Sequence, residues 1–322
     1  MCAVLAAVIV AVGLYSVSVG DFPIPMSDVI GTLVGDPTTE AEFIVGSLRL
    51  PRVITAIGVG AAFGMSGAIF QSLARNPLGS PDIIGFNAGA ALGAVTTIVV
   101  WGGSSLQVSI GALVGGVATA LAVYVLAWKR GLHASRLVLV GIGAGFAISA
   151  VNSYLITRAD INDVQRATVW LTGSLNGRGW DEVRIVVVAL AVLGPLAIVM
   201  QRQLDRLDLG DDTAAALGVR VGSAKLALVL VGVSLAALGV AAAGPVAFVA
   251  FVAGPLARRM TRSPGASVVP AAFVGALVTV TADLLARRVL APTELPVGIL
   301  TAAVGAPYLL WLLTRQARTG AL

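Results

Sequence analysis

The chain has 322 residues, of which 57% are hydrophobic and 11% are charged, and its formal net charge is +5. A soluble domain carries about 25% charged residues and disordered chains are poor in hydrophobic residues, so the composition excludes both classes. The single cysteine, Cys2, excludes a disulfide-stabilised secreted scaffold. We therefore expect an all-α integral membrane protein.

The stretches without charged residues predict the transmembrane helices, because a helix needs about 20 apolar residues to cross the bilayer. Two stretches are too long for one crossing. One breaks at the polar, glycine-rich segment from Trp101 to Ser105, and the other breaks at Pro245, which removes a backbone donor. Residues 1–322 are then one transmembrane domain with ten spans, at about 2–20, 51–74, 83–101, 107–128, 136–157, 182–200, 224–243, 245–260, 267–288 and 295–314.

The distribution of charge predicts the orientation, because basic residues accumulate in cytoplasmic loops. With both termini in the cytoplasm, the cytoplasmic side carries 13 basic and 5 acidic residues, and the outer side carries 8 basic and 11 acidic residues. The basic balance therefore reflects orientation, and no basic stripe interleaved with aromatic residues indicates nucleic-acid binding. The connection 201–223 is the longest one on the cytoplasmic side.

Small residues spaced four apart predict faces where helices approach closely, because such faces drive packing in lipid. The pairs and triplets are Gly60/Gly64, Gly85/Gly89/Gly93, Gly111/Gly115 and Gly141/Gly145.

The sequence lacks the residue patterns of three enzyme classes. His133 is the only histidine, so an H-E-x-x-H zinc motif cannot occur, and Gly218 to Lys225 lacks the spacing of a phosphate-binding loop. Asp205 and Asp208 resemble the D-x-x-D of membrane prenyltransferases, but a second aspartate motif is missing. We therefore expect no catalytic residue, no metal site and no cofactor in this chain. A proton- or ion-coupled secondary transporter stays an alternative of another class, although the charges nearest to the apolar stretches lie at helix ends.

Two connections contain short helices. Residues Ile161 to Leu171 are expected to form a helix at the outer surface, followed by a flexible, glycine-rich exit. Residues Asp211 to Leu217 are rich in alanine, and acidic residues in their first turn suit the helix dipole. Gly210 supplies the turn into this helix and Gly218 the exit from it.

The chain resembles the FecCD-type permeases, the membrane subunits of ABC importers for iron–siderophore complexes, haem and cobalamin. The likeness covers essentially the whole chain. It is carried by an ordered set of segments: Arg49-Leu50-Pro51-Arg52, 60–68, 75–82, 209–218, 244–249, 294–301 and Gly305-Ala306-Pro307.

One departure narrows the resemblance. Many family members have Pro-His near the end of the eighth span, where this chain has Gly254-Pro255, followed by basic residues and the segment Thr261 to Gly265. This variant is similar to one of the two non-identical permeases of enterobactin-type ferric siderophore systems. It favours a heterodimer with a second permease subunit over a homodimer.

The resemblance implies a type II importer permease in the bacterial cytoplasmic (inner) membrane, a multi-pass protein of iron transport that takes up ferric siderophore, with haem or cobalamin as alternative cargo. The partners it implies are a second permease subunit, two copies of a cytoplasmic ATPase subunit and an external substrate-binding protein. ATP and Mg²⁺ would be bound by the ATPase, so the chain itself would be no enzyme.

The resemblance also implies three groups of site residues. The helix in 201–223 would be the coupling helix that docks on the ATPase; its residues are Gly210, Asp211, Asp212, Ala215 and Gly218. Arg49, Arg52 and Arg287 would dock the binding protein at the outer side; the alternative is that they snorkel, or that Arg287 pairs with Asp283 one helical turn away. Asn152, Ser153 and Tyr154 would line the translocation path, and they are equally interpreted as residues that hydrogen-bond between helices.

Overall fold

The computed structural model describes residues 1–36, 41–77, 79–81, 85–128, 134–262 and 265–318. These residues form helices and no strand occurs among them, which confirms the all-α class. Leu78, Asp82, Ser263 and Pro264 of the family-like segments, and the first two residues of the span expected at 83–101, lie outside this description. The helices are α1 (Cys2–Ser18), α2 (Met26–Val34), the π-helix η1 (Glu42–Arg49), α4 (Leu50–Ala74), α5 (Phe86–Trp101), α6 (Ser105–Ala127), α7 (Ala134–Arg158), α8 (Ile161–Leu171), α9 (Trp180–Asp208), α10 (Asp211–Ala216), α11 (Val221–Ala243), α12 (Val249–Thr261), α13 (Val268–Arg288) and α14 (Val297–Arg318).

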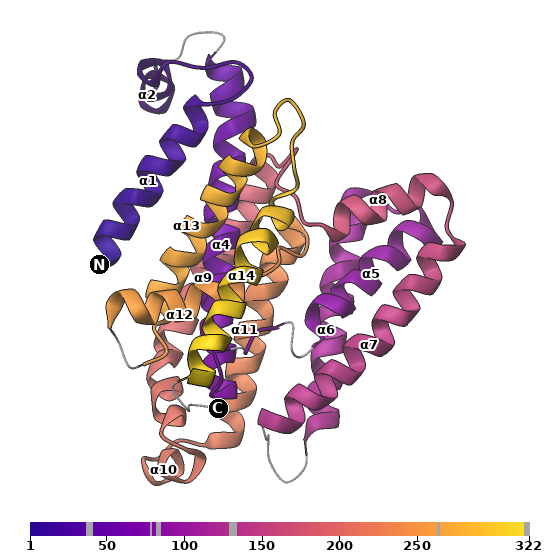
Figure 1. The fold of residues 1–322 in the computed structure, drawn as a ribbon, viewed down its shortest axis with the longest axis vertical. Coiled ribbons are helices and arrows are strands. Elements are labelled where there is room, and N and C mark those ends of the chain that lie inside the picture. Colours follow the sequence, from indigo (N-terminus) through magenta and orange to yellow (C-terminus); the bar gives the residue numbers. More distant parts are fainter. Residues whose placement is uncertain (37–40, 78, 82–84, 129–133, 263–264, 319–322) are drawn as a thin grey trace.

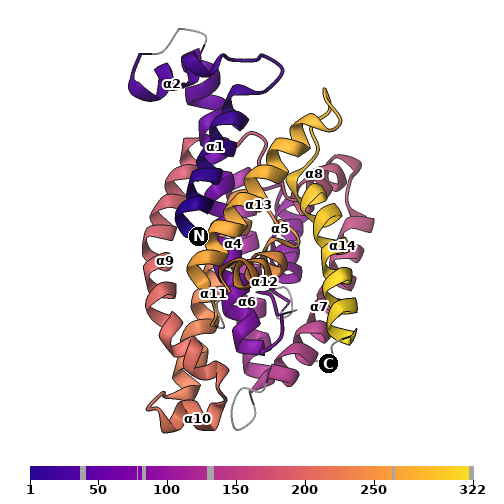
Figure 2. The same ribbon diagram turned by 60° about the vertical axis from the view of Figure 1, so that its left-hand side comes forward.

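Helix α4 is the central element of the bundle. It packs against α9, α11, α12 and α13, which surround it in Figures 1 and 2. Helices α5 to α8 form a second group, at the right in Figure 1, and α6 joins this group to α11. The core therefore lies along α4, and the surface of α7 carries large exposed side chains such as Leu139 and Phe146.

Glycines bring the central helices into backbone contact. A Cβ atom at Gly64 would collide with the carbonyl oxygen of Ala271 on α13, and one at Gly93 on α5 would collide with the carbonyl oxygen of Gly111 on α6. These contacts confirm that the small faces of α4, α5 and α6 are packing faces. An added Cβ at Gly145 on α7 would meet no atom of this chain within 4 Å, so a packing role of this glycine stays a prediction.

Several helices are long and apolar enough to cross a membrane. Six satisfy both criteria among the described residues: 42–74, α6, the segment 136–158 of α7, α9, α11 and α13. Helices α1, α5 and the segment 297–311 of α14 are apolar but shorter, and α12 has 13 residues, including two arginines in its last turn. Each of the ten predicted spans overlaps a helix. That all ten cross the membrane stays a prediction.

Three differences between the helix ends and the expected spans have a clear local cause. The helix expected from residue 51 is preceded without a break by η1, whose π-helical hydrogen bonds precede Pro51, a residue without a backbone donor. Helix α9 continues through residues 201–208 because the two leucines there, Leu204 and Leu207, are buried. Helix α12 begins at Val249 and not at Pro245, since Phe248 has a positive φ of 66°.

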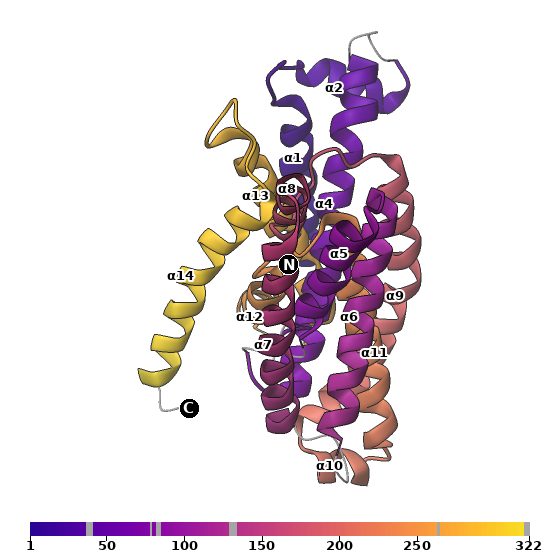
Figure 3. The same cartoon turned by 90° about the vertical axis from the view of Figure 1, so that its right-hand side faces the viewer.

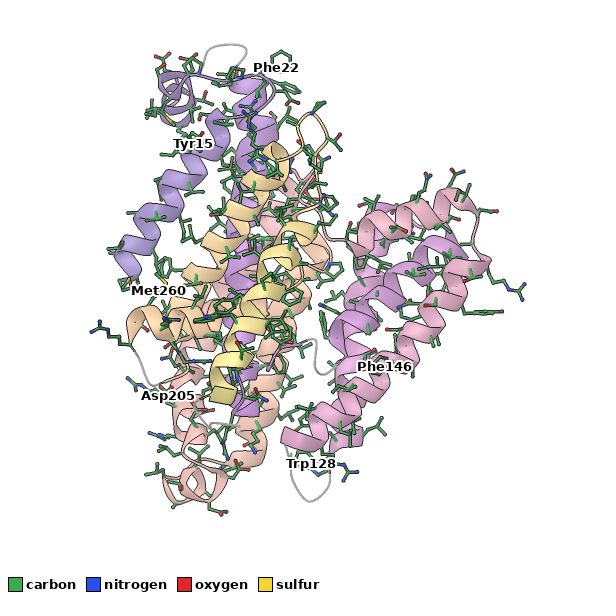
Figure 4. The ribbon with its side chains drawn as sticks, viewed as in Figure 1. Tyr15, Phe22, Trp128, Phe146, Asp205 and Met260 are labelled. Carbon is green, nitrogen blue, oxygen red and sulfur yellow. The ribbon has the colours of Figure 1, made fainter. Side chains whose placement is uncertain are left out.

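The connections between the helices lie at two opposite ends of the bundle. Helix α10 lies at one end, where Asp205 and Trp128 also lie, and Phe22 and Tyr15 lie toward the opposite end (Figures 3 and 4). The short helices expected at 161–171 and 211–217 are confirmed as α8 and α10. The two ends carry the groups of residues described next.

Candidate functional site

An ion-pair cluster connects α1, α4, α13 and the loop before α14, and it consists of Ser16, Arg52, Asp283, Arg287 and Glu294. We call it the outer cluster, after the side of the membrane on which the sequence predicts these residues. Arg52 donates from Nε to Asp283 Oδ1 at 3.0 Å and from Nη1 to Glu294 Oε2 at 3.0 Å. Arg287 Nε lies 3.3 Å from Asp283 Oδ2, and its Nη2 donates to the Ser16 hydroxyl. Asp283 is fully buried. The pairing of Arg287 with Asp283, considered from the sequence as the alternative to docking, is therefore present.

Arg49 differs from the other two arginines that the sequence singles out. Its guanidinium donates to three carbonyl oxygens, those of Val17, Ser18 and Phe22. The carboxylate that acts on its charge is that of Asp21, with which it lines the same cavity. The three arginines do come together: a cavity of about 410 Å³ is lined by Arg49, Arg52 and Arg287, together with Arg178, Asp21 and Glu294.

Helix α10 lies between two glycines whose backbone conformations are unfavourable for other residues. Gly210 has φ of 111° and Gly218 has φ of 82°, both in the region that side chains disfavour. The helix buries one residue, Ala214. Asp212 and Ala215 are exposed. The polypeptide can therefore present α10 at the end of the bundle with little apolar contact to hold it there.

Asp211 lies at a junction of three helices. Its Oδ1 accepts from Arg75 Nη2 at 2.8 Å, and its Oδ2 accepts from Lys225 Nζ at 2.5 Å. Partial burial alone would raise the pKa of Asp211, but the Lys225 ammonium and the Arg75 guanidinium outweigh it and hold the pKa below its ordinary value. The carboxylate is therefore ionised at neutral pH, and its contribution to stability is lost only as the pH falls through the lowered pKa.

The three candidate path residues are consecutive on α7 and differ in their surroundings. Asn152 is buried, and its Nδ2 donates to the carbonyl oxygen of Ala88 on α5 at 3.4 Å. Ser153 donates to Ser149 on its own helix. Tyr154 is 60% exposed, and the guanidinium of Arg158 stacks on its ring. Asn152 therefore acts as an interhelical hydrogen bonder, and Tyr154 faces outward from this chain.

A cavity of about 1010 Å³ lies between α8 and the segments that precede α9 and α14. Its polar lining includes Asn162, Gln165, Arg166 and Arg178. The sequence predicted helix α8 but these lining residues were not predicted. Asn162, Gln165 and Arg166 do recur at helical spacing on one face of 161–171. Arg75 and Lys225 were missed as well, since the sequence contains no signal that pairs them with Asp211. Among the described residues no cluster of three metal-ligating side chains occurs.

Comparisons with known proteins agree with the resemblance seen in the sequence. The chain is 39% identical to the ferric enterobactin transport system permease protein FepG of Escherichia coli (strain K12), over 98% of this chain and 96% of that protein. It is 36% identical to the Fe(3+)-citrate import system permease protein YfmE of Bacillus subtilis (strain 168), over 98% of this chain and 95% of that protein.

A solved structure has the same fold. The inward-facing conformation of a metal-chelate type ABC transporter superposes with a TM-score of 0.86 at 26% identity, and 98% of each chain is covered. The model of the FecCD transport family matches residues 8–315. The chain therefore belongs to the FecCD transport family, as a transport subunit and not as an enzyme.

Proposed function

We propose that this chain is one permease subunit of an ABC importer that takes up ferric siderophore across the bacterial cytoplasmic membrane. The observation that carries the proposal is the likeness to iron-chelate permeases over nearly the whole chain, together with a short exposed helix, α10, at one end of the bundle. In this proposal the chain is the conduit. A separate ATPase subunit binds ATP and Mg²⁺ and supplies the energy.

The proposed topology has ten crossings, with both termini and α10 in the cytoplasm. It is supported by the contacts of the basic clusters, since Arg75 and Lys225 lie at α10 and basic residues mark the cytoplasmic side. Cys2 is the only cysteine, so single cysteines introduced at Phe22 and Thr213 of a Cys2→Ser chain test the orientation. We expect a membrane-impermeant thiol reagent to label position 22, and not position 213, in intact cells; the reverse would overturn the topology.

Helix α10 is proposed as the coupling helix, with Gly210, Asp211, Asp212, Ala215 and Gly218 as its residues. Because Gly218 has φ of 82°, replacing it with valine should impose a backbone strain of about 1–3 kcal/mol and tilt α10. We expect Gly218→Val to lower uptake and ATPase coupling several-fold, while the amount of protein in the membrane stays normal. Uptake equal to that of the unmodified chain would contradict the assignment.

The outer cavity lined by Arg49, Arg52 and Arg287 is proposed to receive acidic side chains of an external binding protein. Arg52 and Arg287 are already paired with Asp283, so Arg49 offers the strongest attraction for a carboxylate of the partner. Arg52 and Arg287 then stabilise the wall of the cavity through these pairs and add positive potential to it.

Reversing the charge at Arg49 tests the docking proposal. We expect Arg49→Glu to weaken binding-protein affinity by about ten-fold, the effect of ~1.4 kcal/mol in a close charge pair. Arg49→Gln removes the positive charge and the guanidinium hydrogen bonds without adding a negative charge, so the difference between the two variants measures the repulsion by the introduced carboxylate. A lysine in place of the acidic residue of the binding protein that faces Arg49 should restore affinity to Arg49→Glu and not to Arg49→Gln. Equal affinity of both variants would contradict the docking role.

The chain is proposed to pair with a second, non-identical permease subunit, with Asn152, Ser153 and Tyr154 near the path between them. The support is the exposed apolar surface of α7, where Leu139 and Phe146 are more than 70% exposed. Co-purification from cells that produce both permeases, each with its own affinity tag, distinguishes a heterodimer from a homodimer.

The cargo is tested by uptake of chelates that carry isotopically labelled iron. We expect accumulation of a ferric siderophore in cells that produce the complete transporter, with no accumulation when the ATPase is inactive. Uptake of haem or cobalamin in its place would identify another cargo of the same family. Accumulation that persists without the ATPase, and is abolished by dissipating the proton gradient, would indicate a secondary transporter.

A further inference from the structure

The short helix α10 is joined to the rest of the chain by one glycine at each end. Gly210 and Gly218 flank it, and both have a left-handed φ. One residue of the helix, Ala214, is buried. A force that acts on α10 could therefore rotate it about these glycines without moving the neighbouring helices, unless side chains tie it to them.

The tie that the structure provides is the carboxylate of Asp211. Its two oxygens accept from Arg75 at the end of α4 and from Lys225 in the first turns of α11. The same Arg75 nitrogen also donates to the carbonyl oxygen of Leu207 in the last turn of α9, at 2.8 Å. Arg75 reaches this place because it ends α4 with a positive φ of 48°, which turns the chain across the end of the bundle. Asp211 thus joins α10 to α4 and α11, and through Arg75 to α9.

Charge and burial give this tie more weight than an ordinary surface ion pair. The side chains of Arg75 and Asp211 are about half exposed, but that of Lys225 is only 11% exposed. The charged nitrogen of a largely buried lysine needs a partner, and leaving it unpaired is strongly unfavourable. Lys225 and Arg75 therefore hold the Asp211 carboxylate from two sides, and the carboxylate connects the two cations.

Helix α4 can carry a displacement from this junction to the outer side. It has 25 residues and is buried along most of its length, and at about 1.5 Å per residue it spans about 37 Å. Its opposite end is anchored by Arg52, which pairs with Asp283 on α13 and with Glu294. A close-packed helix moves as a rigid element. Movement of its inner end therefore displaces the outer cluster and the wall of the cavity that Arg52 and Glu294 line.

We propose that Asp211 is a positioning residue that transmits the displacement of α10 to the central helix α4 through Arg75. This inference rests on the proposed function of α10 as the coupling helix. It assigns Asp211 to transmission inside the permease, whereas the exposed Asp212 and Ala215 face the ATPase.

The test is a double-mutant cycle in the complete transporter, reconstituted in lipid vesicles with its ATPase and binding protein. The variants are Asp211→Asn, Arg75→Gln and the two combined. The readouts are ferric siderophore transported per ATP hydrolysed and the amount of ATPase that co-purifies. We expect each single variant to lower the transport ratio by about five-fold or more, the lower end of typical coupling between sites. The combined variant should lose no more than the larger single loss, and ATPase co-purification should stay normal.

Two further variants separate transmission from a general effect of charge or folding. Asp211→Glu keeps the carboxylate and should retain most of the coupling. Asp181→Asn removes an exposed carboxylate that pairs only with Arg184 among the described residues, and it should leave the ratio unchanged. Losses that multiply in the combined variant, or ATPase that no longer co-purifies with Asp211→Asn, would overturn the inference.

The outcome also separates this inference from the proposed function. If the unmodified transporter moves ferric siderophore and Asp211→Asn does so with the same ratio, the transmission role is wrong and the proposed function stands. If the unmodified transporter moves no ferric siderophore, the proposed function fails, and the inference fails with it.

Discussion

Replacing Arg52 with alanine is expected to lower the free energy of unfolding by about 3–5 kcal/mol, the effect of breaking a buried ion pair by removing one partner. Asp283 is fully buried, and Arg52 contacts its Oδ1 through two nitrogens. Without Arg52, that oxygen stays in the interior of the bundle and loses the guanidinium that donates to it. Arg287 stays on the other oxygen at 3.3 Å and reduces the loss without abolishing it, and Glu294 loses its ion-pair partner.

Unfolding of the purified chain in mixed micelles, titrated with a denaturing detergent and followed by tryptophan fluorescence, measures this loss. Arg184→Ala is the matched control, because its pair with Asp181 is largely exposed at 77% and 88%. Such a pair contributes about 0–1 kcal/mol. Arg52→Lys should fall between the two, since a single ammonium cannot reach Asp283 and Glu294 with the geometry of a guanidinium. If Arg52→Ala and Arg184→Ala unfold alike, the outer cluster does not stabilise the fold.

The outer cluster also illustrates which interactions the sequence can predict. Asp283 and Arg287 are four apart on one helix, so their pairing could be considered from spacing alone. Arg52 lies 231 residues from Asp283 and 242 residues from Glu294, and only the packing of α4 against α13 brings these groups together. For the same reason the sequence singled out Arg52 as a basic residue on the outer side without its carboxylate partners.

Local signals predicted the short helices well and the helix ends less well. Helices α8 and α10 begin where the sequence indicates, because glycines and acidic residues near the helix ends act over a few residues. The continuation of α9 to Asp208 was missed because a charged residue ends a hydrophobic stretch without ending a helix. The spacing of charges indicates where a helix can leave the lipid, while hydrogen bonds and buried leucines decide where it stops.

The transmission role of Asp211 shows a similar limit. Its acidic neighbour Asp212 suits the dipole of α10 equally well, so the sequence alone gives no reason to distinguish them. The structure distinguishes them by their partners, because Asp211 contacts Arg75 and Lys225 while Asp212 is exposed. The difference depends on how α4 ends, and therefore on the positive φ of Arg75.

Glycine spacing predicted that α4 has a packing face, and the structure identifies α13 as the helix on the other side. Gly60 faces the backbone of Gly275, and Gly64 faces that of Ala271, so the two helices touch without intervening side chains. In lipid, where no hydrophobic effect drives helices together, such contact is the main source of association. The α4–α13 contact is also what brings Arg52 to Asp283.

The second large effect is therefore expected for Gly64→Leu. Even a Cβ atom at this position would collide with the Ala271 carbonyl, and Ala253 of α12 lies 3.4 Å away on another side. Overpacking of this kind costs about 1–3 kcal/mol, and separating α4 from α13 should weaken the Arg52–Asp283 pair in addition, for a total loss of about 3 kcal/mol or more.

The same detergent titration measures the loss, with Gly143→Leu as the control, because Gly143 on α7 is a helical glycine with open space around it and leucine favours a helix over glycine by about 1 kcal/mol. Gly64→Leu combined with Arg52→Ala should lose less than the sum of the two single losses, since the first variant already disturbs the pair that the second removes. Additive losses would mean that close packing of α4 on α13 and the outer cluster are independent, and that movement of one does not reach the other.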